Sequence, residues 1–237
     1  MEPDEYAKMH AVEERMWWYR GLHANLLGQL SRYAGEGAVL DAGCGTGGLL
    51  KKLRGEAAGL DYAEIAARHA RAKSGRPVAV GSINDLPFRA GAFAAIVSAD
   101  VLAQESVDEG RALREIRRCL APAGIVILNL PAYAWLASEH DRRVHQPRRY
   151  TARRLRQLLS EAGFRAIFTT YWNSILFPLM VIRRLLLPSG QRGDVQLLPG
   201  PVEAIFRAAV GIEGWFVARG IPLPFGGSVL AVGVKDG

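Results

Sequence analysis

Short apolar runs alternate along the chain with segments whose apolar residues recur every three or four positions. The apolar runs, which predict strands, lie at 38–41, 57–60, 78–80, 93–98, 125–130, 164–171 and 228–234. The helical spacing lies at 5–34, 63–73, 107–120, 152–161, 174–187 and 201–219. Strands that alternate with helices form parallel sheets with right-handed crossovers. The pattern therefore predicts an α/β fold with a seven-stranded, mostly parallel sheet and helices on both faces.

The same pattern divides the chain into four parts. Residues 1–36 are expected to form an N-terminal helical lid in which Gly21 is a candidate kink, and residues 37–172 the core. Residues 173–226 are expected to form a helical insertion between strands six and seven, and 227–237 supply the last core strand. Ligands of open parallel sheets bind beyond the carboxyl ends of the strands, so the loops there are expected to form the site.

Composition narrows the class of protein. A chain of 237 residues can build one substantial core with elaborations. Its two cysteines, Cys44 and Cys119, supply neither a disulfide framework nor a metal cluster, so we expect no metal and a reducing, cytoplasmic location. The acidic N-terminus does not resemble a signal peptide, and the longest apolar run, 175–182, is too short to span a membrane.

The formal charge of +7 is concentrated in arginines between positions 142 and 156. Such a cluster can meet phosphates, nucleic acid or an anionic membrane surface. A solvated helix face followed by a loop explains the same residues equally well. Arg148 and Arg149 are candidates for gripping an anionic acceptor group.

A glycine-rich loop follows the first predicted strand, from Gly43 to Gly48. Glycines let the backbone approach a ligand closely, and the start of the helix expected at 49–53 would favour an anionic group. Asp61 ends the next predicted strand, where a carboxylate can accept hydrogen bonds from ribose hydroxyls. The same spacing also fits a dinucleotide-binding fingerprint, so NAD remains an alternative on this pattern alone.

Four segments, in order, resemble class I methyltransferases that use S-adenosylmethionine (SAM), a family with a Rossmann-like core. They are Val39–Gly47, Gly59–Asp61, Leu86–Phe88 with Phe93–Val97, and Leu113–Gly124. Two further segments resemble a narrower branch of this family: Trp17-Trp18-Tyr19 and the 138–150 loop. Relatives usually carry Asp where this chain has Ser82 and Ala94.

The resemblance implies SAM as the cofactor and assigns residues to its binding. These are Asp41, Gly43, Cys44, Gly45, Gly47, Asp61, Tyr62, Ser82, Ile83, Ser98 and Gln104. In this assignment Asp61 holds the ribose, and Ser82 and Ile83 border the adenine. Gln104 lies near the transferred methyl group.

The candidate catalytic residues lie in the loop after strand five. His140 and His145 are candidate general bases because imidazole titrates near neutral pH, Asp141 is placed to orient one of them, and Tyr150 to line the site. The alternative is that these residues hold a long loop in place through hydrogen bonds. The apolar insertion is open to three interpretations: a pocket for a lipid-like acceptor, a membrane contact, or extra core and a homodimer interface.

The leading hypothesis is a SAM-dependent methyltransferase that acts on a small-molecule or a lipid- or glycan-linked acceptor, at oxygen. The alternatives are an RNA methyltransferase and a non-catalytic SAM-binding partner protein. No RNA-binding appendage is visible, so nucleic acid is not an expected partner. The four segments in register argue against an NAD-dependent oxidoreductase.

Overall fold

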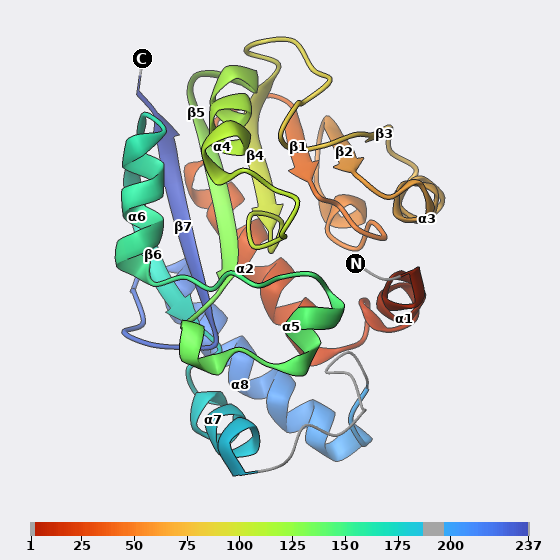
Figure 1. Ribbon diagram of the computed structural model, residues 1–237, viewed down its shortest axis with the longest axis vertical. Coiled ribbons are helices and arrows are strands. Elements are labelled where there is room, and N and C mark those ends of the chain that lie inside the picture. Colours follow the sequence, from red (N-terminus) through yellow and green to blue (C-terminus); the bar gives the residue numbers. More distant parts are fainter. Residues whose placement is uncertain (1–2, 187–196, 237) are drawn as a thin grey trace.

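The computed structural model describes residues 3–186 and 197–236, which form a seven-stranded sheet covered by helices (Figure 1). The strand order is β3-β2-β1-β4-β5-β7-β6. The strands are β1 Val39–Ala42, β2 Ala57–Asp61, β3 Val78–Val80, β4 Phe93–Ala99, β5 Leu120–Pro131, β6 Phe164–Trp172 and β7 Ser228–Lys235. β7 runs antiparallel to both of its neighbours, and the pairs among β1 to β5 are parallel. The predicted fold, with its mostly parallel sheet, is confirmed.

Two layers of helices enclose the sheet. The helices are α1 Pro3–Val12, α2 Trp17–Tyr33, α3 Glu64–Ser74, α4 Glu109–Cys119, α5 Glu139–Arg143, α6 Ala152–Glu161, α7 Phe177–Leu186 and α8 Gly200–Ala218. Buried side chains of α4 and α6 pack on one face, and those of α2, α3 and α8 pack on the other. Two short 3₁₀ helices, η1 Leu50–Lys52 and η2 Ala134–Leu136, lie in the connections.

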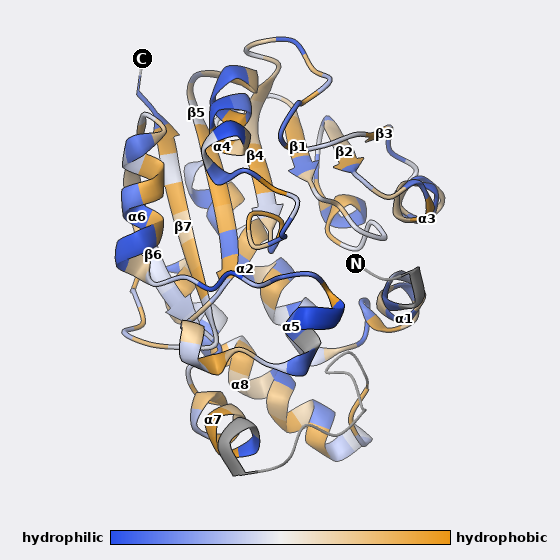
Figure 2. Ribbon diagram, in the orientation of Figure 1, coloured by the Kyte–Doolittle hydropathy of each residue, from blue (hydrophilic) through white to orange (hydrophobic). Residues whose placement is uncertain are grey.

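The central strands are apolar at nearly every position because both faces of the sheet are covered. In β4, Ile96 packs into the core beneath α4 and α6, whereas its neighbours Ala95 and Val97 pack toward α2 and α3. Successive side chains of a strand point to opposite faces, so each strand contributes to both cores. Figure 2 shows the resulting apolar bands along the strands.

The structure corrects the prediction of one N-terminal helix over 5–34. α1 and α2 are separate helices, and the chain turns between Glu13 and Met16. Gly21, the candidate kink, lies inside α2 and is buried against Val210 and Trp172. The break lies at Glu13 because its carboxylate turns inward to bind the glycine loop, as described below.

Three other expectations change in detail. The helix expected at 49–53 is the three-residue η1, so the glycine loop does not lead into a long helix. The loop at 131–150 contains η2 and α5. The insertion holds α7 and α8, while the predicted end of its first helix, residue 187, lies outside the described residues. Across the described ranges, none of the helices is long and apolar enough to cross a bilayer.

Candidate functional site

A cavity of about 1240 Å³ opens at the carboxyl ends of β1, β2 and β4. Its floor includes Asp41, Gly43 and Asp61, and residues of α1 and α2 line its other side. Sites for one small ligand usually enclose about 300–1,000 Å³. The cavity therefore has room for two ligands side by side. This is the edge of the sheet at which the strand pattern predicted binding.

The glycine loop lies close across the end of β2. The backbone N–H groups of Gly43 and Cys44 both donate to the carbonyl of Leu60, at 2.7 and 2.9 Å. Gly43 has a φ of 92°, and a Cβ built there would lie 2.0 Å from Cγ2 of Val101. Only glycine fits that backbone conformation and that space. The loop is therefore fixed against the end of β2, with its backbone facing the cavity.

Asp61 is buried at the end of β2 and accepts hydrogen bonds from three donors. Its Oδ2 accepts from the backbone N–H of Gly45 at 2.8 Å, and its Oδ1 from that of Ala63 at 3.0 Å. The hydroxyl of Tyr6, on α1, also donates to it. Burial raises the pKa of Asp61, and these donors oppose that rise by stabilising the charged form. The carboxylate is therefore oriented toward the loop, as a ribose ligand requires.

Asp41, the last residue but one of β1, lies just before the glycine loop and is 3% exposed. Its Oδ2 has no hydrogen-bond partner among the described residues. Burial raises the pKa of this carboxyl to about 8, and the nearby charges of Asp61 and Glu13 contribute to the rise. An unpartnered buried acceptor is costly, and a cationic ligand group in the cavity would satisfy it. The residues present therefore fit a ligand with a positive charge and a ribose.

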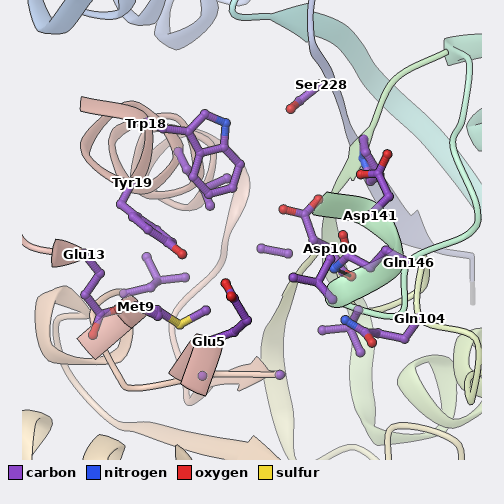
Figure 3. Close-up of a pocket in the computed structure, with 18 of the residues that line it drawn as sticks. Glu5, Met9, Glu13, Trp18, Tyr19, Asp100, Gln104, Asp141, Gln146 and Ser228 are labelled. Carbon is purple, nitrogen blue, oxygen red and sulfur yellow. Dashed lines mark hydrogen bonds between the residues drawn. The ribbon is translucent and has the colours of Figure 1, made fainter. Parts of the chain in front are cut away.

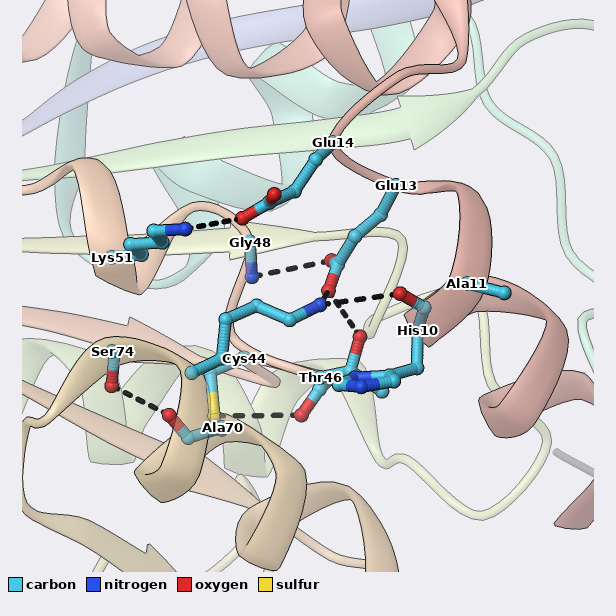
Figure 4. A network of polar contacts seen from close by, with 12 residues as sticks. His10, Ala11, Glu13, Glu14, Cys44, Thr46, Gly48, Lys51, Ala70 and Ser74 are labelled. Carbon is cyan, nitrogen blue, oxygen red and sulfur yellow. Dashed lines mark hydrogen bonds and ion pairs between the residues drawn. The ribbon is translucent and has the colours of Figure 1, made fainter. Parts of the chain in front are cut away.

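Glu13 fixes the turn between α1 and α2 to the glycine loop (Figure 4). Its carboxylate accepts from the hydroxyl of Thr46, from the backbone N–H of Gly48 at 3.2 Å and from the ammonium of Lys73. Lys73 and Glu13 are both almost fully buried, so this ion pair is shielded from solvent. The contacts explain why the N-terminal helix breaks here and keep α1 over the cavity.

Asp100 follows β4 on the opposite wall, in a left-handed conformation with a φ of 59°. The side-chain amide of Asn129 donates to its Oδ1 at 3.2 Å, and the backbone N–H of Asp100 donates to the carbonyl of Asn129 at 2.7 Å. Burial raises the pKa of Asp100 to about 7, while the charge of Arg149 and the Asn129 hydrogen bond lower it. This carboxyl can therefore exchange a proton near neutral pH.

The 131–150 loop is held in place by its own charged residues. Arg149 binds Asp141 through two nitrogens, with distances of 2.8 to 3.0 Å, and also donates to the carbonyl of Ala132. Arg148 donates to backbone carbonyls of the 104–107 segment. Both arginines are therefore engaged within the protein, and the candidate role of gripping an anionic acceptor is not supported.

Nine of the eleven predicted cofactor residues line the cavity. They are Asp41, Gly43, Cys44, Gly45, Asp61, Tyr62, Ser82, Ile83 and Gln104. Gly47 and Ser98 do not line it. Gly47 packs against the backbone of Ala70 in α3, and Ser98 is fully buried inside β4. The residues just after Ser98 reach the cavity instead: Ala99, Asp100 and Val101.

The predicted catalytic residues are placed differently from one another. His145 and Asp141 line the cavity, but the carboxylate of Asp141 binds Arg149 and the backbone N–H of Ser138. Tyr150 is buried away from the lining, and its hydroxyl donates to the carbonyl of Leu102 at 3.0 Å. Its position fits the alternative in which it anchors the loop. The side chain of His140 lies outside the described part of the structure.

Sequence reasoning missed Glu5, Tyr6 and Asp100, all of which line the cavity. Asp100 lies just past the end of a parallel strand, the same signal that identified Asp61, and could have been found by it. Glu5 and Tyr6 carry no comparable signal. They are ordinary positions of a surface helix until the turn at Glu13 brings α1 over the sheet.

A family model described as a methyltransferase domain matches residues 40–128. This segment is similar in sequence to methyltransferase domains. The match runs from β1 into β5, and it therefore contains the glycine loop, Asp61 and Asp100. The domain supplies the floor of the cavity and one of its walls, whereas the lining residues of α1, α2 and the insertion lie outside it.

Two curated proteins are similar to parts of the chain. An uncharacterized protein of Methanocaldococcus jannaschii is 40% identical over 92 residues, which is 39% of this chain and 36% of that protein. A protein of Encephalitozoon cuniculi, whose methyltransferase assignment is itself a prediction, is 31% identical over 142 residues. That alignment covers 59% of this chain and 63% of the relative. The chain thus matches less than two thirds of the length of either protein.

Solved structures share the fold over nearly the whole chain. A chain in the complex between the Haloferax volcanii Trm112 methyltransferase activator and its methyltransferase partner has a TM-score of 0.65 at 21% identity, covering 99% of this chain and 95% of that one. A geranyl diphosphate methyltransferase in complex with SAM has a TM-score of 0.63 at 14% identity, covering 91% and 85%. The fold of this chain is that of class I methyltransferases.

Proposed function

We propose that the chain is a SAM-dependent methyltransferase. The observation that carries the proposal is the pair of buried carboxyls, Asp41 and Asp61, set around a glycine loop whose backbone faces the cavity. The methyltransferase domain at 40–128 and a structural neighbour solved with SAM support the same cofactor.

Residues of the domain would hold the cofactor along its length. Asp61 would accept from the ribose hydroxyls, and the loop from Gly43 to Gly45 would pass beside the methionine part. Ser82 and Ile83, which line the cavity after β3, would border the adenine. Bound there, the cofactor would supply an activated methyl group. The protein would contribute chiefly by orientation, because holding two reactants in line accounts for much of the acceleration of such reactions.

The acceptor would lie between the end of β4, the 131–150 loop and the insertion. Apolar side chains of the insertion line this end of the cavity, among them Leu176, Met180 and Phe206. They support a small-molecule or a lipid- or glycan-linked acceptor with an apolar body. The sequence predicted oxygen as the atom that accepts the methyl group. The carboxyls at the acceptor end of the cavity influence which kind of accepting atom can bind there.

The alternative of an RNA methyltransferase is not favoured by the charge of the cavity. Seven carboxylic acids and two arginines are among its lining residues. A phosphate backbone requires the opposite balance, because its binding depends on lysine and arginine. Arg149 of the cluster at 142–156 does line the cavity, but it is paired with Asp141.

The insertion also offers a surface for a membrane. Ile205, Ile212 and Trp215 of α8 and Ile182 of α7 are all at least half exposed. An apolar helical face of this kind next to arginines is typical of helices that lie on a bilayer. We expect sedimentation with anionic vesicles that is lost in Ile205→Asp and Ile212→Asp. A homodimer in solution that buries this face would contradict the membrane role.

The central experiment is a calorimetric titration with SAM and, separately, with NAD. We expect SAM to bind and NAD not to bind, and Asp61→Ala to abolish the binding of SAM. Glu64→Gln is the matched control, because Glu64 is an exposed carboxylate of the next helix. Unchanged SAM affinity in Asp61→Ala would refute the cofactor assignment. SAM binding without turnover on any acceptor would favour the non-catalytic partner protein.

A further inference from the structure

The charge of the cavity is opposite to that of the protein around it. The chain as a whole carries a formal charge of +7, whereas carboxylic acids outnumber arginines by seven to two in the cavity lining. The lining contains no lysine among the described residues. Such an arrangement concentrates negative potential in one place, since low-dielectric walls strengthen the field of buried charges.

Most of these carboxyls already have a partner or an assigned ligand. Glu13 binds Lys73, and Asp141 binds Arg149. Asp41 and Asp61 belong to the glycine-loop end of the cavity, where the proposed cofactor would meet them. Glu105 is exposed at the rim. Asp100 and Glu5 remain: Asn129 binds one oxygen of Asp100, and Lys8 binds one oxygen of Glu5.

Glu5 is a buried carboxylate with an unused oxygen. It is 4% exposed, and its Oε2 has no hydrogen-bond partner among the described residues. Its other oxygen accepts from Lys8, whose side chain is half exposed, at 2.6 Å. Figure 3 shows the carboxylate of Glu5 pointing from α1 into the cavity. A buried unpaired oxygen on a carboxylate is costly, and a donor on a ligand in the cavity would satisfy it.

Asp100 points into the same space from the end of β4 (Figure 3). Asn129 binds one of its oxygens. The charged groups that face it are Arg149 and Asp141, which are paired with each other at 2.8 Å and so largely cancel. The carboxyl of Asp100 therefore acts on the cavity as a single negative charge when ionised. Burial raises its pKa to about 7, and Arg149 and the Asn129 hydrogen bond offset only part of that rise.

Aromatic rings form another part of the cavity wall. Trp18 and Tyr19 line the cavity, with ring centroids 5.0 Å apart in an edge-to-face arrangement. Burial raises the pKa of the Tyr19 hydroxyl, and the charges of Glu13, Asp100 and Glu5 add to the rise. Aromatic faces beside carboxylates are the surroundings in which proteins bind organic ammonium groups.

We propose that the methyl acceptor is a small amine that is cationic in solution, with its ammonium group between Glu5 and Asp100 and its apolar body against Trp18 and the insertion. The inference rests on the proposed methyltransferase function and replaces the expected oxygen acceptor with nitrogen. A neutral alcohol would bring no positive charge to the unused oxygen of Glu5 or to Asp100, so the site would favour the amine by charge.

The chemistry balances with Asp100 as the base. The ammonium group transfers one proton to the carboxylate of Asp100, which leaves a lone pair on nitrogen. That pair forms the new nitrogen–carbon bond while the carbon–sulfur bond of the methyl donor breaks, with its electron pair kept by sulfur. The methylated nitrogen becomes cationic, and the proton on Asp100 passes to solvent. Glu5 holds the cation throughout.

The test compares amines with alcohols of the same shape. Phenethylamine and 2-phenylethanol form one pair, and tryptamine and tryptophol form another. Each is titrated into the protein alone and into the protein with S-adenosylhomocysteine, and binding is measured by calorimetry. We expect the amine of at least one pair to bind about tenfold more tightly than its alcohol, because a charge-assisted contact is lost in the alcohol. Asp100→Asn and Glu5→Gln should each reduce that preference, whereas Glu64→Gln should not.

Equal binding within both pairs, or no binding by any of the four, overturns the inference. An amine preference that disappears when S-adenosylhomocysteine is present also overturns it, because the carboxyls would then serve the cofactor's own ammonium. The comparison on the wild-type protein needs no variant, so a variant that fails to fold does not affect it. Failure of SAM to bind would instead refute the proposed function, and it is measured separately.

Discussion

The side-chain amide of Asn129 joins Asp100 to Trp172. Its nitrogen donates to Oδ1 of Asp100 at 3.2 Å, and its oxygen accepts from the indole N–H of Trp172 at 2.7 Å. Asn129 and Trp172 are both fully buried. The amide therefore has one donor and one acceptor partner, which fixes its orientation and with it the carboxyl of Asp100. Asn129 is a positioning residue rather than a ligand of the substrate.

Asn129→Ala is expected to destabilise the protein and to loosen Asp100. The change leaves the indole N–H of Trp172 buried without a partner, which costs about 1–3 kcal/mol of unfolding free energy. Urea denaturation measures that loss. Trp172→Phe is a control that removes the donor and spares the contact with Asp100. If turnover falls as far in Trp172→Phe as in Asn129→Ala, the effect on catalysis comes from stability alone.

Gly43→Ala is expected to be far more damaging than the same change at Gly55. Both glycines have a positive φ, 92° at Gly43 and 68° at Gly55. A Cβ at Gly43 would lie 2.0 Å from the side chain of Val101, whereas at Gly55 nothing lies within 4 Å. Gly55→Ala should lower the free energy of unfolding by only about 1–2 kcal/mol, the cost of a left-handed backbone conformation for a residue with a Cβ. Gly43→Ala should exceed that loss in thermal or urea unfolding and should also abolish cofactor binding, and equal losses would contradict the crowding argument.

The sheet could be predicted because every strand carries its own signal. Runs such as 93–98 and 125–130 are apolar on both faces, and each is bounded by glycine, proline or polar residues, so the observed strands differ from the prediction mainly at their ends. The break between α1 and α2 could not be predicted in this way. Its cause is the contact of Glu13 with Thr46 and Lys73, which lie 33 and 60 residues away along the chain.

The same distinction between local patterns and long-range contacts applies to the site. The glycine-loop end of the cavity was predictable because a glycine loop and an acidic strand end are local patterns at the carboxyl edge of the sheet. The proposed acceptor end is assembled from α1, the end of β4 and the insertion, which only the fold brings together. Asp141 illustrates the difference, since its partner Arg149 lies eight residues away on a loop whose path no local pattern specifies.

Tyr6→Phe is expected to strengthen SAM binding. The hydroxyl of Tyr6 donates to Asp61, the carboxylate proposed to hold the ribose, and so competes with the cofactor for the same acceptor. One hydrogen bond of this kind contributes about 0.5–1.5 kcal/mol, so affinity should rise about threefold to tenfold by calorimetry. Tyr33→Phe is the matched control, because Tyr33 packs against Phe168 away from the cavity. Weaker binding in Tyr6→Phe would show instead that the hydroxyl contacts the cofactor.

The stability of the unliganded protein is expected to fall as pH rises toward 8, in part because of Asp41. Burial raises the pKa of this carboxyl from 3.8 to about 8, so the folded state favours the neutral form. A group with a raised folded pKa contributes stability that is fully present below the unfolded value and is lost as pH rises through the folded one. The window for Asp41 therefore runs from about pH 4 to about pH 8.

Asp41→Asn isolates this contribution from the other titrating groups. Asp100 acts in the same direction, and His23, whose pKa burial lowers to about 3, acts in the opposite direction below neutral pH. Subtracting the unfolding free energy of Asp41→Asn from that of the wild type at each pH cancels both. The difference should move in favour of the variant between pH 4 and pH 8. A flat difference would mean that Asp41 is ionised in the folded protein and has a counter-charge.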